Sequence, residues 1–220
     1  MTAAVFIGWQ MMENCAQCSG TGWVMTGTAA VACKCAIERM IESRLPKHYL
    51  NARMSDFSAE IRELVTASRT EPAFSLLLTG PVGSGKTHLA AAICRHLIEN
   101  GRNARFAICE RYYSDLRESY RAGNSEEAVI APLERVTFLV LDDLGAGSLS
   151  DHERRSTLTL LSRRLNAKLT TIVTTNWSLP KIAERMDDRI ASRLAAFRAI
   201  ELVGSDRRLN RVGGDGPEHR

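Results

Sequence analysis

The stretch that decides the fold reads Gly80-Pro81-Val82-Gly83-Ser84-Gly85-Lys86-Thr87. It is a complete G-x-x-x-x-G-K-[ST] phosphate-binding loop. Its glycines let the backbone turn tightly, so that successive N–H groups can point at phosphate oxygens. Lys86 can reach the β- and γ-phosphates, and the Thr87 hydroxyl can ligate Mg²⁺. The loop therefore predicts a nucleoside triphosphate site; the alternative is a glycine-rich turn that binds nothing.

The sequence on both sides supports this interpretation. An apolar run at 74–79 suits a buried parallel strand, and Leu89, Ile93 and Leu97 repeat at helical spacing after the loop. We expect strands at 74–79, 104–109, 136–141, 170–175 and 199–203, and helices at 86–100, 111–122, 125–134, 151–167 and 179–196. Alternating strands and helices predict an α/β fold with a parallel sheet covered on both faces.

Two acidic residues follow the expected strand 136–141. Asp142 would hold Mg²⁺, directly or through water, and Asp143 would orient and deprotonate the attacking water. Asn176 follows the strand 170–175, on the side of a parallel sheet where ligands bind. Its amide could position that water, or it is an ordinary asparagine that ends a strand.

Two arginines, Arg189 and Arg193, are spaced i, i+4 on one expected helix. Such a pair is usually a solvated face. The spacing also allows one of them to reach the γ-phosphate of a neighbouring subunit, a role that arginine suits.

Four cysteines near the N-terminus form two close pairs, Cys15 with Cys18 and Cys33 with Cys35. The β-prone stretch 21–31 can form a hairpin that returns the second pair, so four thiolates could surround one tetrahedral Zn²⁺. The alternative is four unrelated reduced thiols. Cys94 and Cys109 are expected in a helix and a strand, as core residues.

Composition sets further bounds. The chain has 220 residues with a net charge of +4, which permits nucleic-acid binding but does not argue for it. No apolar run approaches the ~20 residues of a membrane span, so we expect no membrane association and a cytoplasmic location. Met11 and Met12 leave open a later start.

We expect four parts along the chain: a zinc-knuckle module at 1–45, a linker with helical pieces at 46–72, an ATPase domain at 73–210, and a tail without regular structure at 211–220. Ser150 and Glu153 form a capping box at the start of the helix 151–167.

Together these elements resemble the DnaC/IstB-like branch of AAA+ ATPases. Residues 80–87 match Walker A, 139–145 match the D-D-L-G form of Walker B, and Asn176 matches sensor 1. Arg193 matches the arginine finger, and Arg208 matches the sensor 2 arginine, with Arg207 as the other candidate. The resemblance extends to the cysteine pairs and to Leu45-Pro46-Lys47-His48-Tyr49, and so covers roughly residues 15–208.

The resemblance implies an AAA+ core with a five-stranded parallel sheet and a truncated lid. It also implies self-association through the ATPase domain, ATP hydrolysis across the subunit interface with Mg²⁺, and service as a loader that places a replicative helicase on single-stranded DNA. The residues it implies as catalytic are Lys86, Asp143, Asn176 and Arg193, with Asp142 and Arg208 in nucleotide binding.

Three other functions stay open. One is an IstB-like ATPase that activates a transposase, another a small-molecule kinase, and the third a binding module that does not hydrolyse ATP. A mixture of arginines and tyrosines at 110–121 suits single-strand binding by stacking and phosphate contact, or is an amphipathic helix.

Overall fold

The computed structural model describes residues 15–68 and 74–203, and it divides the chain into two compact units, residues 1–43 and residues 44–220. Each unit is described by itself below. The predicted sensor 2 candidates Arg207 and Arg208, and the predicted tail 211–220, lie outside the described residues.

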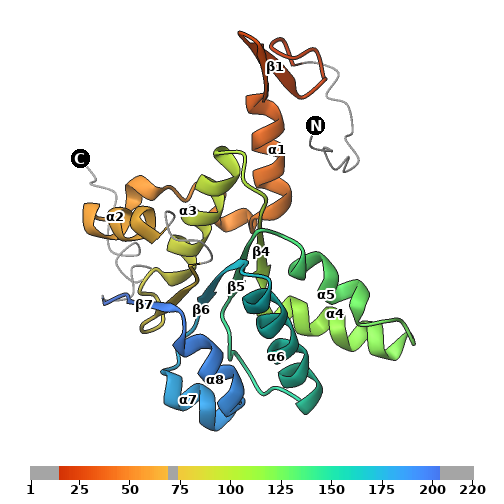
Figure 1. Ribbon diagram of the computed structural model, residues 1–220, viewed down its shortest axis with the longest axis vertical. Coiled ribbons are helices and arrows are strands. Elements are labelled where there is room, and N and C mark those ends of the chain that lie inside the picture. Colours follow the sequence, from red (N-terminus) through yellow and green to blue (C-terminus); the bar gives the residue numbers. More distant parts are fainter. Residues whose placement is uncertain (1–14, 69–73, 204–220) are drawn as a thin grey trace, which may run out of the picture. The chain divides into compact units, whose positions relative to one another are not determined.

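The second unit is built on one parallel sheet. Its strands are β3 (Leu76–Thr79), β4 (Ala104–Ile108), β5 (Phe138–Asp142), β6 (Thr170–Thr174) and β7 (Arg198–Glu201), in the order β4-β5-β6-β3-β7 (Figure 1). All four pairings are parallel, with Leu76 opposite Ile172 and Leu139 opposite Thr171. Leucine and valine dominate β3 and β5, and β6 adds buried threonines to Ile172 and Val173, because both faces of the sheet are covered. The predicted α/β fold with a five-stranded parallel sheet is confirmed.

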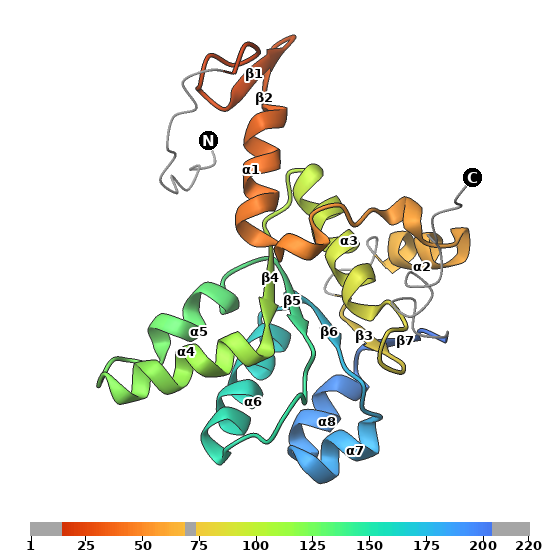
Figure 2. The same cartoon turned by 180° about the vertical axis from the view of Figure 1, so that it is seen from behind.

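Helices cover both faces of this sheet (Figures 1 and 2). Those of the second unit are α2 (Ala59–Ser68), α3 (Lys86–Glu99), α4 (Cys109–Arg121), α5 (Glu127–Glu134), α6 (Asp151–Asn166), α7 (Leu179–Arg185) and α8 (Asp188–Ala195). Two short 3-10 turns, Lys47–Tyr49 and Met54–Asp56, precede α2 in the segment predicted as a linker. Helix α3 packs on one face, while alternate strand residues such as Leu77, Leu139 and Val173 form the core with α4, α5, α6 and α8 on the other.

Two expected elements differ in detail. The helix expected at 179–196 is two helices, because Asp187 is extended (φ −171°) and caps α8 by accepting a hydrogen bond from the Arg189 N–H. Cys109 begins α4 rather than ending a strand, but it is buried in the core as expected, as is Cys94 in α3. The capping box of Ser150 and Glu153 is confirmed at the start of α6.

The first unit contains a small antiparallel hairpin and a helix. Strand β1 (Trp23–Thr26) pairs with β2 (Ala29–Ala32), and Trp23 lies opposite Ala32. Helix α1 (Lys34–Arg44) follows directly and extends to the boundary between the units. The predicted hairpin between the cysteine pairs is therefore confirmed.

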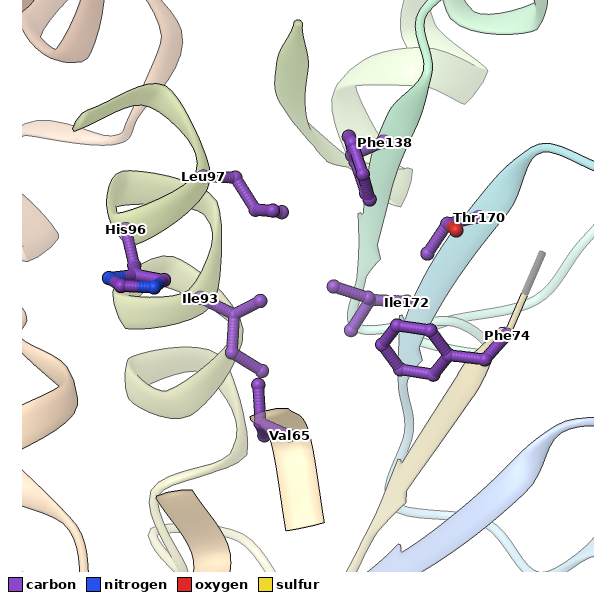
Figure 3. Close-up of a pocket in the computed structure, with 8 residues that line it drawn as sticks. All are labelled: Val65, Phe74, Ile93, His96, Leu97, Phe138, Thr170 and Ile172. Atoms are coloured by element: carbon purple, nitrogen blue, oxygen red, sulfur yellow. The ribbon is translucent and has the colours of Figure 1, made fainter. Parts of the chain in front are cut away.

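An apolar pocket in the second unit lies between α3 and the sheet (Figure 3). Ile93, Leu97 and Val65 approach it from the helices, and Phe138 and Ile172 approach it from the strands. Phe138 is the first residue of β5, so the pocket lies near the amino ends of the strands, whereas the phosphate loop leaves the carboxyl end of β3. Among the described residues, none of the helices has the length and apolar character to cross a lipid bilayer.

Candidate nucleotide-binding site

The phosphate loop joins β3 to α3, as its sequence predicts. Gly80 has φ +139°, and a Cβ there would lie 2.3 Å from the carbonyl oxygen of Leu202. Leu202 reaches this position because its N–H donates to the Thr79 carbonyl at 2.8 Å, which extends the pairing of β7 with β3. Glycine is required at position 80 because the chain after β7 passes against the first residue of the loop.

Lys86 is the first residue of α3, and its side chain is 7% exposed. Its ammonium donates to the carbonyl oxygens of Gly80 at 2.9 Å and Pro81 at 2.7 Å, with the Ser84 hydroxyl at 3.5 Å. The loop thus closes around a positive charge, and Pro81 and Val82 are exposed at its tip. This arrangement supplies the buried cation and the backbone N–H groups that a triphosphate needs.

Asp142, the last residue of β5, lies at the same edge of the sheet and is only 6% exposed. Its Oδ1 accepts a hydrogen bond of 2.7 Å from the Thr174 hydroxyl. Burial raises the pKa of the Asp142 carboxyl, and hydrogen bonds from the Thr174 and Thr87 hydroxyls oppose that rise. The Thr87 hydroxyl and the Asp142 carboxylate are therefore neighbours, and oxygen ligands of these two kinds fit Mg²⁺.

Asp143 lies in the turn after β5 with a left-handed backbone (φ +59°). Its N–H donates to the Thr174 hydroxyl at 2.8 Å, and its Oδ1 accepts from the Asn176 amide at 3.3 Å. The structure thus brings together the carboxylate and the amide that the sequence assigns to the attacking water. One hydroxyl, that of Thr174, orients both acids, and sequence reasoning missed it because a threonine in a β-branched strand gives no separate signal.

Helix α8 carries both predicted arginines. The Arg189 guanidinium pairs with Asp187 through Nε at 3.0 Å and Nη2 at 2.9 Å, and this hydrogen-bonded pair lowers the pKa of Asp187 to about 2. The Nε of Arg193 donates to the Ser162 hydroxyl of α6 at 2.6 Å. Asp187 therefore engages Arg189 within its own chain, and Ser162 holds Arg193 by one edge of its guanidinium.

The four cysteines of the first unit converge on one point. Their Sγ atoms all lie within 4.8 Å of one another, with Cys15 to Cys33 at 3.8 Å and Cys18 to Cys35 at 3.5 Å. A tetrahedron with Zn–S bonds of about 2.3 Å has S···S edges of about 3.8 Å, so the cluster could bind a metal ion of this kind.

The C-x-C spacing of the second pair has a structural reason. The Cys33 carbonyl accepts from the N–H groups of Ala36 and Ile37, so Cys33 caps α1 and Cys35 lies in its first turn. In the first pair, N–H groups of Cys18 and Gln17 lower the pKa of the Cys15 thiol to about 6.

Burial and the neighbouring sulfurs act in the opposite sense on Cys35 and raise the pKa of its thiol to about 12. If all four thiols ionised, a divalent cation would be needed to balance their charge, and the cluster could bind one.

A family model described as IstB-like ATP binding protein matches residues 42–196. The chain belongs to the IstB-like ATP-binding protein family. The matched residues include the phosphate loop, Asp142, Asp143, Asn176 and Arg193, but neither the four cysteines nor Arg208.

Relatives with names match more than half of the chain. The replicative helicase loader DnaC of Escherichia coli strain K12 is 30% identical over 130 residues, which are 59% of this chain and 53% of that protein. An ATP-binding protein of insertion sequence IS21 from Pseudomonas aeruginosa is 28% identical over 140 residues, 64% of this chain and 52% of its own. The chain thus spans about half the length of the curated relatives it matches.

Solved structures show the same core. A crystal structure of the DnaC helicase loader superposes with a TM-score of 0.63 at 25% identity, covering 72% of this chain and 100% of that one. The replication initiator DnaA bound to AMPPCP and single-stranded DNA superposes with a TM-score of 0.64 at 18% identity, covering 73% of this chain and 51% of that one. The latter likeness shows the fold alone. Family and fold together identify a DnaC/IstB-like AAA+ ATPase core, as the sequence motifs predict.

Proposed function

We propose that this protein hydrolyses ATP and uses it to assist the placement of a replicative helicase on single-stranded DNA. The observation that carries hydrolysis is the pairing of Asp143 with Asn176 next to Asp142 and the phosphate loop. The observation that carries the helicase-loading role is the likeness in sequence and in fold to the DnaC helicase loader. A role on DNA beside such a helicase also implies a cytoplasmic location.

Each residue of the site has a chemical task in this proposal. Lys86 binds the β- and γ-phosphates, and Thr87 with Asp142 holds Mg²⁺, which when bound neutralises phosphate charge. Asp143 accepts a proton from the attacking water, while the Asn176 amide orients that water and the carboxylate. The left-handed turn at Asp143 directs its carboxylate toward Asn176.

Turnover and nucleotide affinity of two variants test the site. Lys86→Ala should abolish ATP binding because it removes the buried cation, whereas Asp143→Asn should bind ATP like the parent and lose hydrolysis because an amide cannot accept the proton. Asp115→Asn, at an exposed position of α4, is the matched control and should hydrolyse ATP normally. Equal ATP affinity of Lys86→Ala and the parent would contradict the assignment of the site.

Arg193 is proposed to act on the nucleotide of a neighbouring subunit, with Ser162 holding its Nε and its two terminal nitrogens left for phosphate oxygens. Arg193→Ala should bind ATP nearly as well as the parent, and turnover should fall by about 10³-fold or more. Arg208 is proposed as the sensor 2 residue of the same site.

A mixing experiment tests the action in trans. Arg193→Ala mixed with Lys86→Ala can form composite sites with one intact Lys86 and one intact Arg193, so part of the turnover should return as protein concentration rises. Arg121→Ala, which replaces an exposed arginine of α4, is the control. This variant should hydrolyse ATP without the addition of a second variant. Failure to recover turnover at any ratio, with self-association confirmed, would show that Arg193 does not act in trans.

The proposed contact with single-stranded DNA involves fewer residues than the sequence indicates. Tyr112 and Tyr113 are buried in the core and cannot stack on bases, while Tyr120 is 74% exposed and Arg111 and Arg121 are exposed on the same helix. Tyr120→Ala should weaken binding of fluorescent single-stranded DNA, and Arg111→Ala should also reduce the salt dependence. Unchanged affinity in both variants would remove α4 from the proposed DNA contact.

We also propose that Cys15, Cys18, Cys33 and Cys35 bind one structural Zn²⁺. Four sulfur ligands complete a tetrahedral shell and leave no open position for catalysis, so the ion would stabilise the first unit. The distances among the four sulfur atoms support this assignment.

The second candidate function is an IstB-like ATPase that activates a transposase, favoured by the family model and by the relative from insertion sequence IS21. Phosphate release with and without single-stranded DNA, then with a replicative helicase or a transposase of the same host, separates the two candidates. Stimulation by the transposase alone would favour the second one. Phosphate transfer to a small acceptor would indicate a kinase, and no phosphate release at all would indicate a binding module.

A further inference from the structure

Two turns at the carboxyl edge of the sheet are locked to each other. The turn after β5 contains Leu144, whose N–H donates to the Thr174 carbonyl at 2.8 Å and whose carbonyl accepts from the Thr175 hydroxyl at 2.7 Å. The same Thr175 hydroxyl accepts from the Trp177 N–H at 3.1 Å. Thr174 and Thr175 are 1% and 0% exposed, so these bonds are shielded from water.

The indole of Trp177 lies directly on the turn that carries Asp143. Gly145 has φ +92°, and a Cβ on it would lie 2.6 Å from the indole ring, which is closer than carbon atoms approach without displacement. Any residue with a side chain at position 145 would therefore push Trp177 away. The contact explains the glycine of the D-D-L-G sequence and shows that the indole packs directly on the turn.

The same indole also contacts α7. The ammonium of Lys181 lies 5.6 Å from the ring centroid and the guanidinium of Arg185 lies 5.8 Å from it. Trp177 packs against the hydrophobic core together with Leu179 of this helix. Helix α7 packs in turn on α8, which carries Arg193. The side chain of Trp177 therefore contacts both the turn that carries Asp143 and α7, the helix that packs on α8.

We propose that Trp177 is a positioning residue for ATP hydrolysis, an inference that rests on the proposed ATPase function. Its indole holds the Asp143 turn against α7, so the carboxylate and Asn176 stay paired and a displacement of the turn is passed to α7 and α8. Trp177 touches no reacting atom in this proposal. Its loss should therefore affect the rate of the chemical step much more than the affinity for ATP.

Steady-state kinetics on two variants test this role. Trp177→Ala should lower kcat by about tenfold to 10²-fold with KM within about threefold, because a misplacement of about 1 Å can cost about 10²-fold in rate. Trp177→Phe keeps a ring on Gly145 and should stay within about threefold of the parent. Trp23→Ala removes an exposed indole of the hairpin in the first unit and is the matched control, which should leave kcat unchanged.

The outcomes separate this inference from the proposed function. A parent without any turnover overturns both, whereas an active parent with an equally active, folded Trp177→Ala overturns the inference alone. Circular dichroism and thermal melting check the fold of each variant.

Fluorescence provides a second measurement that needs no change at position 177. Trp9→Phe combined with Trp23→Phe leaves Trp177 as the single tryptophan of the chain. Adding ATP and Mg²⁺ should shift its emission or its quenching by iodide, and Lys86→Ala in the same background should abolish that response. Unchanged emission, with ATP binding confirmed by calorimetry, would overturn the inference even if Trp177→Ala fails to fold.

Discussion

The hairpin of the first unit and the sheet of the second unit bury their side chains to opposite degrees. In the hairpin, Trp23 is 48% exposed and Met25 is 69% exposed, whereas Leu76 and Leu78 of β3 are 0% exposed. A chain of about 40 residues or fewer rarely buries enough apolar surface to fold alone. We therefore expect the order of the first region to depend on metal binding by its four cysteines, whereas the second region is held by a buried sheet.

Removal of the proposed zinc ion should have the largest effect on folding. This effect should be confined to the first unit. Cys15→Ser with Cys33→Ser should reduce bound zinc from one ion per chain to none and unfold residues 15–43, since structural zinc contributes about 10–16 kcal/mol in comparable small sites. Nucleotide affinity of the second unit should stay within about threefold. Metal analysis, hydrogen exchange and ATP titration measure the three quantities.

Cys94→Ala is the control for this experiment, because Cys94 is a buried residue of α3 and should not change the zinc content. Zinc that stays bound in the double variant would contradict the proposed site. Unfolding of both regions together would contradict the comparison drawn above.

The second prediction concerns a buried cation in the sheet region. Arg164 of α6 is 0% exposed and donates to the carbonyl oxygens of Leu133, Val136 and Thr170 at 2.8, 2.7 and 2.6 Å. Burial lowers the pKa of Arg164 to about 10. Arg164→Met leaves these carbonyls without their donor and should destabilise the second unit by about 3 kcal/mol or more, measured by urea unfolding.

The neighbouring Arg163 is the matched control. Its guanidinium pairs with Glu127 and Glu134, and its side chain is 42% exposed. Arg163→Met should cost much less stability than Arg164→Met, because exposed ion pairs are weak. Equal losses in the two variants would mean that the buried hydrogen bonds of Arg164 do not stabilise this region.

The smallest effect should come from Asp187, whose pKa the Arg189 guanidinium lowers to about 2. Its ionised form contributes stability that is fully present above the pKa of the unfolded chain, about 3.9, and is lost as the pH falls toward 2. Asp187→Asn keeps a residue that caps helices well but removes the charge. The difference in melting temperature between the parent and this variant should be largest near pH 6 and shrink below pH 4; a constant difference would exclude the charge as its origin.

The sequence was sufficient to predict the five strands, the hairpin and the neighbours of the phosphate loop. Strong periodicity and the apolar runs before Gly80 and Asp142 specify these elements, and the strand ends differ from expectation by one or two residues. The break between α7 and α8 was missed, although Asp187 offered the signal of a helix cap.

Other features could not be predicted from single residues. Arg163 and Arg164 are adjacent and chemically identical, and only the packing of α6 on the sheet decides which one is buried. In the same way, the tyrosines of α4 differ in burial: Tyr112 and Tyr113 are both buried, whereas Tyr120 is 74% exposed. The roles of Thr174 and Trp177 depend on contacts between two segments that are more than 30 residues apart in the chain. The hydrogen bonds of Asp143 with Thr174 and Asn176 are examples of such contacts.

The hydrogen bonds of Lys86 to the Gly80 and Pro81 carbonyls have a consequence for any binding measurement. A phosphate that reaches this ammonium exchanges with bonds that already exist, so the measured affinity reports a difference between two states of the lysine rather than the full strength of the new contact. Nucleotide binding also need not order the loop, because the hydrogen bonds of Lys86 already hold the loop in this shape. We therefore expect a ligand with several negative charges to replace both carbonyls more readily than a weaker anion does.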